Sequence, residues 1–161
     1  MSNTLDPRAL RSALGTFATG ITIVTTRDAQ GRDWGLTVNS FNSVSLEPPL
    51  VLWSLGKRNE ATLAAFREAG HFAVHVLAAE QEALSNLFAS PNADRFSAQE
   101  ITRGAGGVPL LPGCLAVFEC RTSAIHAGGD HDIFLGEVLV FTSREGAPLL
   151  YHGGRYAKLA E

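Results

Sequence analysis

The sequence predicts a mainly β fold in which an antiparallel barrel carries two or three short helices. About six segments have the β-branched or alternating composition of strands. The helical segments do not alternate regularly with them, which disfavours a doubly wound parallel sheet. No predicted strand is followed by Gly-x-Gly-x-x-Gly, so a Rossmann site for a nicotinamide is not expected. Since 161 residues suffice for one core, we expect a single domain over residues 1–161.

The composition is that of an ordinary globular protein. Hydrophobic residues make up 45% of the chain and charged residues 18%. A net charge of −3 indicates no basic surface for nucleic acid. The N-terminal residues lack the apolar core of a signal peptide, and no apolar run reaches the roughly 18 residues of a membrane span. We therefore expect a soluble, cytoplasmic protein that binds neither nucleic acid nor a membrane.

The N-terminal segment has the pattern of an amphipathic helix. Asp6 is a suitable N-cap, and Pro7 suits the first helical position. Leu10, Leu14 and Phe17 then recur at helical spacing. We expect this apolar face to pack on the body of the protein, although it would also fit an interface between subunits.

Strands and two further helices are predicted along the rest of the chain. A helix at 60–69 has Asn59 as its N-cap, and residues 80–89 have helix-forming composition. Residues 90–112, rich in Gly and Pro, are expected to form a loop. Strands are predicted at 21–26, 34–45, 50–53, 72–77, 114–126, 133–141 and 149–151.

The two cysteines are expected to be buried free thiols. Cys114 and Cys120 fall in one predicted strand, which would separate their Cα atoms by roughly 20 Å. A disulfide needs Cα atoms within about 7 Å, and two cysteines at this spacing make no zinc site.

Polar and cationic residues gather around the predicted start of the helix at 60–69. They are Ser54, Lys57, Arg58, Asn59 and Thr62. A phosphate group is bound by such a combination of free backbone N–H groups, hydroxyls and cations. The alternative is a capped surface helix whose charges are solvated.

A second polar cluster occupies residues 37–43, inside a predicted strand. It includes Thr37, Asn39 and Ser40. Polar residues at successive positions suit a strand that hydrogen-bonds a planar ligand. The alternative is a strand end exposed to water.

A histidine between two carboxylates forms the third cluster. His131 lies between Asp130 and Asp132 on a predicted tight turn. Too few other ligands accompany it for a metal site, so it is either a turn histidine or a cofactor contact. Gly-x-Ser-x-Gly, His-Glu-x-x-His and the P-loop pattern are absent from the sequence, which leaves acyl and phosphoryl transfer without support.

Several segments together resemble the flavin reductase-like family, whose fold is the FMN-binding split barrel. They include Gly-Asp-His at 129–131 and Ser-Leu-Glu-Pro-Pro at 45–49. The likeness is strongest to the short-chain reductase components of two-component flavin monooxygenases. It implies an antiparallel Greek-key split β-barrel with flanking helices. The matching segments are residues 17–26, 35–41, 43–50, 72–77, 129–131, 136–138 and 148–151.

The resemblance also implies a role for each cluster. The strand beginning near Thr37 would lie along the isoalloxazine ring and ribityl chain, and the helix start would hold the phosphate. A Phe-Ala…Arg-Phe segment would close over the flavin. His131 would be the catalytic contact that positions the nicotinamide, and Tyr156 would border the same cleft. The cofactor-binding residues are then Thr37, Val38, Asn39, Ser40, Ser54, Leu55, Lys57, Asn59, Thr62, Phe88, Ala89, Arg95, His131 and Tyr156.

The function implied is that of an NAD(P)H:flavin oxidoreductase. NADH or NADPH would reduce FMN or FAD by hydride transfer from nicotinamide C4 to flavin N5. A homodimer would supply reduced flavin to a partner flavin-dependent monooxygenase. The alternatives are a tight FMN-binding electron-transfer or sensor protein, an amine oxidase resembling pyridoxamine phosphate oxidases, and a non-catalytic interaction scaffold. The Gly-Asp-His and Ser-Leu-Glu-Pro-Pro segments favour the reductase.

Overall fold

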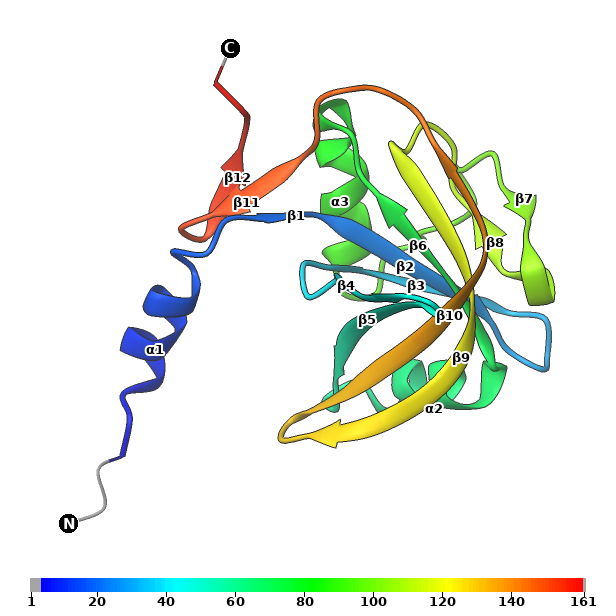
Figure 1. Cartoon of the computed structure of the whole chain (residues 1–161), viewed down its shortest axis with the longest axis horizontal. Helices are drawn as coiled ribbons and strands as arrows, with labels where there is room; N and C mark the ends of the chain where they lie inside the picture. Colours follow the sequence, from blue (N-terminus) through cyan, green and yellow to red (C-terminus); the bar gives the residue numbers. More distant parts are fainter. Residues whose placement is uncertain (1–3, 161) are drawn as a thin grey trace.

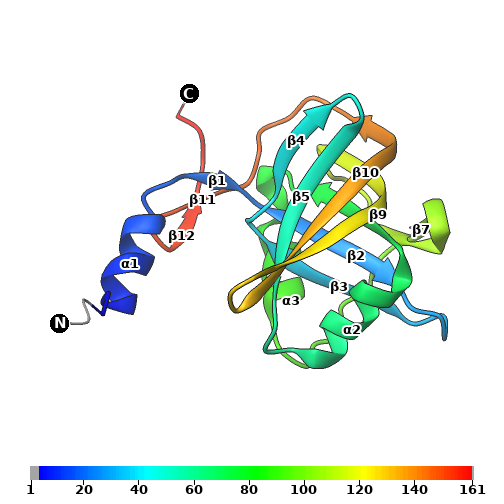
Figure 2. The same ribbon diagram turned by 60° about the horizontal axis from the view of Figure 1, so that its bottom comes forward.

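Seven antiparallel strands form the main sheet, shown from two sides in Figures 1 and 2. The computed structural model describes residues 4–160. Along the sheet the strand order is β3-β2-β6-β9-β10-β5-β4. The strands are β2 Thr22–Arg27, β3 Asp33–Val38, β4 Asn42–Leu46, β5 Pro49–Gly56, β6 His71–Val76, β9 Ala116–Gly128 and β10 His131–Ser143.

The main sheet curls into a barrel that stays open between its edge strands β3 and β4 (Figure 2). The long hairpin β9–β10 joins the two halves, because β9 pairs with β6 while β10 pairs with β5. Two register shifts in this hairpin, at Leu135/Gly136 and Val138/Val140, help to bend it around the core. The predicted mainly β antiparallel split barrel with flanking helices is confirmed.

Aromatic side chains fill one half of the barrel interior. Trp53 of β5 stacks on Phe134 of β10, with ring centroids 4.9 Å apart. Phe66 meets Trp53 edge-on at 4.9 Å. Such pairs contribute about 0.5–1.5 kcal/mol beyond the burial of their area. They fix the end of β5, from which the chain enters the functional site.

Two helices cover the barrel at positions that agree with the sequence. Helix α2 (Glu60–Ala69) begins after its N-cap Asn59 and ends at Gly70, whose φ of 72° is the left-handed conformation that glycine adopts without cost. Helix α3 (Glu82–Ala89) follows a 3₁₀ turn, η1 (Ala79–Gln81), and packs on β3. Among residues 4–160, no helix has the length and apolar character needed to cross a membrane.

Helix α1 (Pro7–Leu14) does not pack on the body of the protein, contrary to the prediction. Its predicted N-cap is confirmed, because Asp6 accepts a hydrogen bond from the N–H of Arg8. None of its residues is buried, however, and Leu14 and Phe17 are 67% and 79% exposed. The chain leaves α1 into a small separate sheet, which holds the helix away from the barrel (Figure 1).

This small sheet has the order β1-β11-β12. It consists of β1 (Thr19–Gly20), β11 (Leu150–His152) and β12 (Arg155–Ala157). The last of these strands was not predicted, because two glycines, at 153 and 154, form the tight turn that folds it back onto β11.

The strand predicted at 34–45 is two strands, β3 and β4. The chain turns at residues 39–41 to pass from one edge of the main sheet to the other. Ser40 fixes this corner, because its Oγ accepts a hydrogen bond of 2.9 Å from the N–H of Ser54 on β5. The polar residues at 37–43 therefore include a corner between two strands. The sequence pattern, which continues through it, does not reveal this corner.

The predicted loop at 90–112 is mostly irregular but contains three short elements. They are β7 (Thr102–Arg103), η2 (Ala105–Gly107) and β8 (Pro109–Leu110). The strand predicted at 114–126 begins only at Ala116, so Cys114 and Cys120 do not share a strand as predicted. Both cysteines are nevertheless buried free thiols, and burial raises their pKa values to about 11 and about 12.

Candidate functional site

Three adjoining pockets form one groove along the open edge of β3. We name them the His131 pocket, the α2 pocket and the Trp34 pocket, with volumes of about 300, 300 and 320 Å³. The His131 pocket is lined by Leu36, Thr37, Val38, Asn39, Ser40, Ser54, Gly56 and His131. The α2 pocket is lined by Leu36, Thr37, Leu55, Gly56, Arg58, Asn59, Thr62, Phe88, Ala89 and Arg95. The Trp34 pocket is lined by Asp33, Trp34, Gly35, Asn59, Thr62, Asn92, Ala93, Asp94, Arg95 and Phe96.

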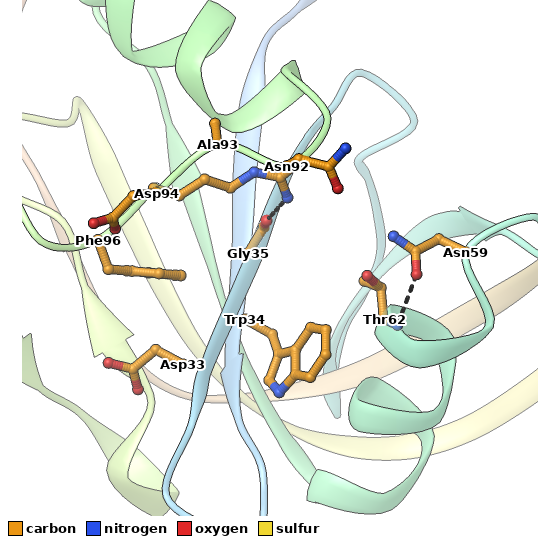
Figure 3. Close-up of a pocket in the computed structure, with 10 residues that line it drawn as sticks. Asp33, Trp34, Gly35, Asn59, Thr62, Asn92, Ala93, Asp94 and Phe96 are labelled. Carbon is orange, nitrogen blue, oxygen red and sulfur yellow. Dashed lines mark hydrogen bonds between the residues drawn. The ribbon is translucent and has the colours of Figure 1, made fainter.

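The edge of β3 offers backbone groups rather than hydroxyls to a ligand. Arg95 donates from a guanidinium nitrogen to the carbonyl oxygen of Gly35, which shows that this carbonyl faces outward (Figure 3). Because strand geometry repeats every two residues, the N–H and C=O of Thr37 lie on the same open edge. The Thr37 hydroxyl itself donates to the carbonyl of Ser85 at 2.6 Å. A planar ligand in the groove would therefore meet the Thr37 backbone.

The start of α2 offers unpaired backbone N–H donors that could bind an anion. Asn59 Oδ1 accepts a hydrogen bond of 3.1 Å from the N–H of Thr62, which satisfies that donor. Among the described residues, the N–H groups of Glu60 and Ala61 have no acceptor. These free N–H groups form the positive end of the helix dipole.

Two arginines bring positive charge to the same place. Arg58 and Arg95 both line the α2 pocket. Arg95 is held in position by the carbonyls of Gly35 and Ser90, and burial lowers its pKa from the ordinary value without neutralising it. Within residues 4–160 it forms no ion pair, so its charge is left for a ligand. With the start of α2, these cations fit the phosphate of a flavin nucleotide.

His131 closes the opposite end of the groove. Its Nδ1 is 2.7 Å from Asp130 Oδ1, and this hydrogen bond is the main reason that the pKa of Asp130 is lowered. Its Nε2 lies toward Gly56, 3.6 Å from where a Cβ on that residue would be. If Nδ1 carries the proton that Asp130 accepts, Nε2 is a free acceptor beside the pocket. Among residues 4–160, no three His, Cys, Asp or Glu side chains are grouped to hold a metal ion.

Twelve of the fourteen predicted binding residues line these three pockets. Lys57 does not, because its Nζ donates to the carbonyl of Gly129 at 2.9 Å, and the neighbouring Arg58 enters the groove instead. Tyr156 does not either, because its hydroxyl bonds Asn86 Oδ1 at 3.0 Å and so lies against α3. The residues brought together are Thr37, Val38, Asn39, Ser40, Ser54, Leu55, Asn59, Thr62, Phe88, Ala89, Arg95 and His131.

The Trp34 pocket was not predicted from the sequence, apart from Asn59, Thr62 and Arg95, which it shares with the α2 pocket. Its far wall is the loop at 92–96, which approaches β3 only because Gly35 has no side chain. A Cβ on Gly35 would lie 2.9 Å from Phe88 and 3.0 Å from Phe96. The available signal was the Gly35 in a predicted strand interior, since glycine there often marks a close approach of another segment.

Residues 14–160 match the flavin reductase like domain family. The chain therefore belongs to the flavin reductase-like family, in agreement with its split-barrel fold.

Two relatives place it more closely within that family. It is 48% identical over 155 residues to the FMN reductase (NADH) SmoA of Agrobacterium fabrum, covering 96% of this chain and 87% of that one. It is 44% identical over 149 residues to the reductase component of the flavin-dependent trigonelline monooxygenase of Acinetobacter baylyi, covering 92% of this chain and 48% of that one. The chain thus spans about half the length of the latter.

A solved structure shares the same architecture. The NADH:FAD oxidoreductase SgcE6 of Streptomyces globisporus, in complex with NAD and FAD fragments, is 39% identical, with a TM-score of 0.87. The likeness covers 99% of this chain and 98% of that one.

Proposed function

We propose that this protein is an NAD(P)H-dependent flavin reductase that supplies reduced FMN or FAD to a partner monooxygenase. The observation that carries the proposal is the groove itself, with cations and a helix start in the α2 pocket and a histidine in the adjoining His131 pocket. When bound, the nicotinamide supplies a hydride from C4 and the flavin accepts it at N5. The names of the relatives, which include an NADH-dependent FMN reductase and a monooxygenase reductase component, support the same reaction.

The α2 pocket would hold the flavin phosphate. The free N–H groups at the start of α2 donate to it, and Arg58 and Arg95 offset its charge. Arg95 needs no reorganisation on binding, because two backbone carbonyls already hold its guanidinium.

The isoalloxazine ring would lie along β3 between this phosphate position and His131. Leu36 and Val38 offer apolar surface to the ring, and the open backbone groups of Thr37 can hydrogen-bond its polar edge. The Ser40 hydroxyl is already engaged with the backbone of Ser54, so it shapes the corner of the pocket.

His131 would position the nicotinamide. Asp130 holds the imidazole through Nδ1, which leaves Nε2 to accept a hydrogen bond from the carboxamide N–H of the nicotinamide. His131 thereby orients the ring without transferring a proton, because hydride transfer itself requires none from this group.

We expect a second copy of this chain to bind through exposed apolar residues on β4 and β10, forming a homodimer. Leu46, at 94% exposure, and Phe141, at 65%, lie on β4 and β10, the strands that flank β5. Val44 on β4 and Leu139 and Val140 on β10 are exposed as well. Exposed apolar side chains of this kind favour association, and an isologous homodimer would bury the same surface on both copies.

The detached helix α1 supports the same assembly. The exposed Leu14 at the end of the helix and Phe17, three residues further on, line a further pocket together with Asn39 and Tyr151. Asn39 also lines the His131 pocket, so a second copy packed against α1 would border the flavin site.

We treat residues 1–161 as one domain, because the family match extends over residues 14–160. Nicotinamide reductants and a soluble oxygenase partner would place the reaction in the cytoplasm.

Oxidation of the nicotinamide by the purified protein tests the reductase directly. We expect the rate to rise and saturate as FMN or FAD is added, and the comparison of NADH with NADPH to identify the reductant. A protein that retains its flavin through dialysis and shows no such turnover would instead be the tight FMN-binding carrier.

A further inference from the structure

Asp132 is a buried carboxylate that the proposed reaction does not use. It follows His131 directly on β10 and is only 3% exposed. Because side chains alternate along a strand, Asp132 shares with Phe134 the face that packs against α2, whereas His131 lines the groove. A buried carboxylate is costly unless cations and hydrogen bonds compensate it, so its partners indicate what it does.

Two cations from different segments hold this carboxylate. Arg67, in the last turn of α2, donates from Nε to Asp132 Oδ2 at 2.7 Å. Lys57, between β5 and α2, forms an ion pair with Oδ1 at 3.8 Å. The side chains of Arg67 and Lys57 are 48% and 38% exposed, so it is the carboxylate that is withdrawn from water. Asp132 therefore ties β10 to the last turn of α2 and to the segment that precedes this helix.

Lys57 also holds the turn that leads to His131. Its backbone N–H donates to the carbonyl of Asp130 at 2.9 Å, and its Nζ donates to the carbonyl of Gly129 at 2.9 Å. The imidazole of His131 is hydrogen-bonded to the side chain of Asp130, which is 89% exposed. Such an exposed partner holds the ring weakly, so the position of His131 depends on the backbone that Lys57 and Asp132 fix on either side of it.

Stability alone does not account for a charge at this position. Replacing a buried ion pair by apolar residues of similar volume is often neutral or stabilising. The residue paired with Asp132 on β5, Leu55, is apolar and 3% exposed, so the sheet itself does not require a charge here. The best-attested use of a buried ionic group is to fix one arrangement of the chain. The arrangement fixed here is the end of β10 that carries His131.

We propose that Asp132 is a positioning residue, which acts with Lys57 and Arg67 to hold His131 at the nicotinamide. The inference rests on the proposed function, because it takes His131 as the contact that orients the nicotinamide carboxamide. Asp132 itself lines none of the three pockets of the groove. Its removal therefore acts through His131. A contact that is equally strong in the ground state and the transition state changes KM and leaves kcat unchanged when it is lost.

The test combines Asp132→Asn with His131→Ala in a double-mutant cycle. We expect Asp132→Asn to raise the KM for NADH about fivefold, with kcat and the flavin dissociation constant within about twofold of the wild type. In the double variant the KM should be no higher than in His131→Ala, because Asp132 reaches the nicotinamide only through His131. Increases that multiply would overturn the proposal, since a general loosening of the fold would add to the loss of the imidazole. An unchanged KM in Asp132→Asn would overturn it too.

Arg67 provides a second route to the same comparison if Asp132→Asn does not fold. Its side chain is half-exposed, so Arg67→Gln removes the contact from the solvent side of the pair. We expect Arg67→Gln to raise the KM for NADH about fourfold and Arg67→Lys, whose ammonium still reaches the carboxylate, to raise it less than about twofold. Equal KM values for these two variants would contradict the role given to Asp132.

Arg121→Gln is the matched control, because it breaks an ion pair of 2.7 Å with Glu137 farther along the same hairpin. Its KM for NADH should stay within about twofold of the wild type, and a rise as large as that of Asp132→Asn would overturn the proposal. A wild-type protein that oxidises no NADH with added flavin would overturn the proposed function itself. Normal wild-type turnover with an unchanged KM in Asp132→Asn would overturn this inference alone.

Discussion

The imidazole of His131 is held at one nitrogen and open at the other, which predicts a selective defect when it is removed. We expect His131→Ala to raise the KM for NADH about tenfold, because the variant loses the acceptor that orients the carboxamide. Flavin affinity should change less than twofold, since the phosphate site lies in the α2 pocket, which His131 does not line. Steady-state kinetics and flavin titrations measure the two effects.

The matched control for this variant is His126→Ala, on the exposed face of β9, which should leave both constants unchanged. A loss of flavin affinity in His131→Ala with an intact KM for NADH would contradict the role given to His131.

His75 predicts how stability depends on pH. The side chain is fully buried, with Nδ1 on the carbonyl of Ile23 at 3.0 Å and Nε2 accepting from the N–H of Leu111 at 3.1 Å. Burial lowers its pKa from 6.5 to about 4. The unfolded chain therefore binds the proton first, and the free energy of unfolding falls between pH 6.5 and pH 4, by about 3 kcal/mol in all.

Urea denaturation at pH 7 and pH 5 checks this effect against His75→Gln, which has no titrating group at the position. We expect the wild type to lose more stability than the variant over this interval. Parallel pH profiles would show that His75 is not the group responsible.

Replacement of Gly35 is expected to disturb the packing of helix α3 and of the 92–96 loop on β3. A methyl group at this position would collide with Phe88 of α3 and Phe96 of the loop, so Gly35→Ala should push both away from β3. We expect the free energy of unfolding to fall by about 1–3 kcal/mol and flavin affinity to fall with it, because Arg95 is carried by the same loop.

Gly20→Ala is the control for Gly35→Ala, since a Cβ there meets nothing within 4 Å. Urea denaturation measures both variants, and equal stability of the two would contradict the close approach at Gly35.

Elements that depend on local chemistry were predictable, and those that depend on distant contacts were not. The bounds of α2 follow from Asn59 at its start and Gly70 at its end, both of which are visible in the sequence. The break between β3 and β4 depends on Ser40 reaching Ser54 on another strand. No local pattern reveals such a contact.

The same distinction applies to the site. The sequence shows two adjacent cationic residues before α2, but the β9–β10 hairpin determines in which direction each side chain extends. Lys57 is drawn to the carbonyl of Gly129 and Arg58 is left to face the groove. The Trp34 pocket could not be predicted, because the 92–96 loop that forms its wall has no regular structure.

At the scale of the whole molecule, the exposed apolar surface on β4 and β10 predicts a dimer. We expect Leu46→Glu to raise the dimer dissociation constant about 30-fold or more, since a buried charge would replace an apolar contact. The monomer should keep its stability, because Leu46 is 94% exposed. Sedimentation velocity measures the change.

Gln30→Glu adds the same charge on the β2–β3 turn and serves as the control. A wild-type protein that sediments as a monomer at micromolar concentration would contradict the assignment of this surface.

The lengthwise placement of the flavin, with its phosphate at the start of α2, is tested most directly by comparing FMN with riboflavin, which lacks the phosphate. Arg58→Gln should weaken FMN binding about fivefold to tenfold and leave riboflavin binding unchanged, whereas Lys57→Gln should alter neither by more than twofold. An equal loss of both ligands in Arg58→Gln, or a larger loss of FMN in Lys57→Gln, would contradict this placement.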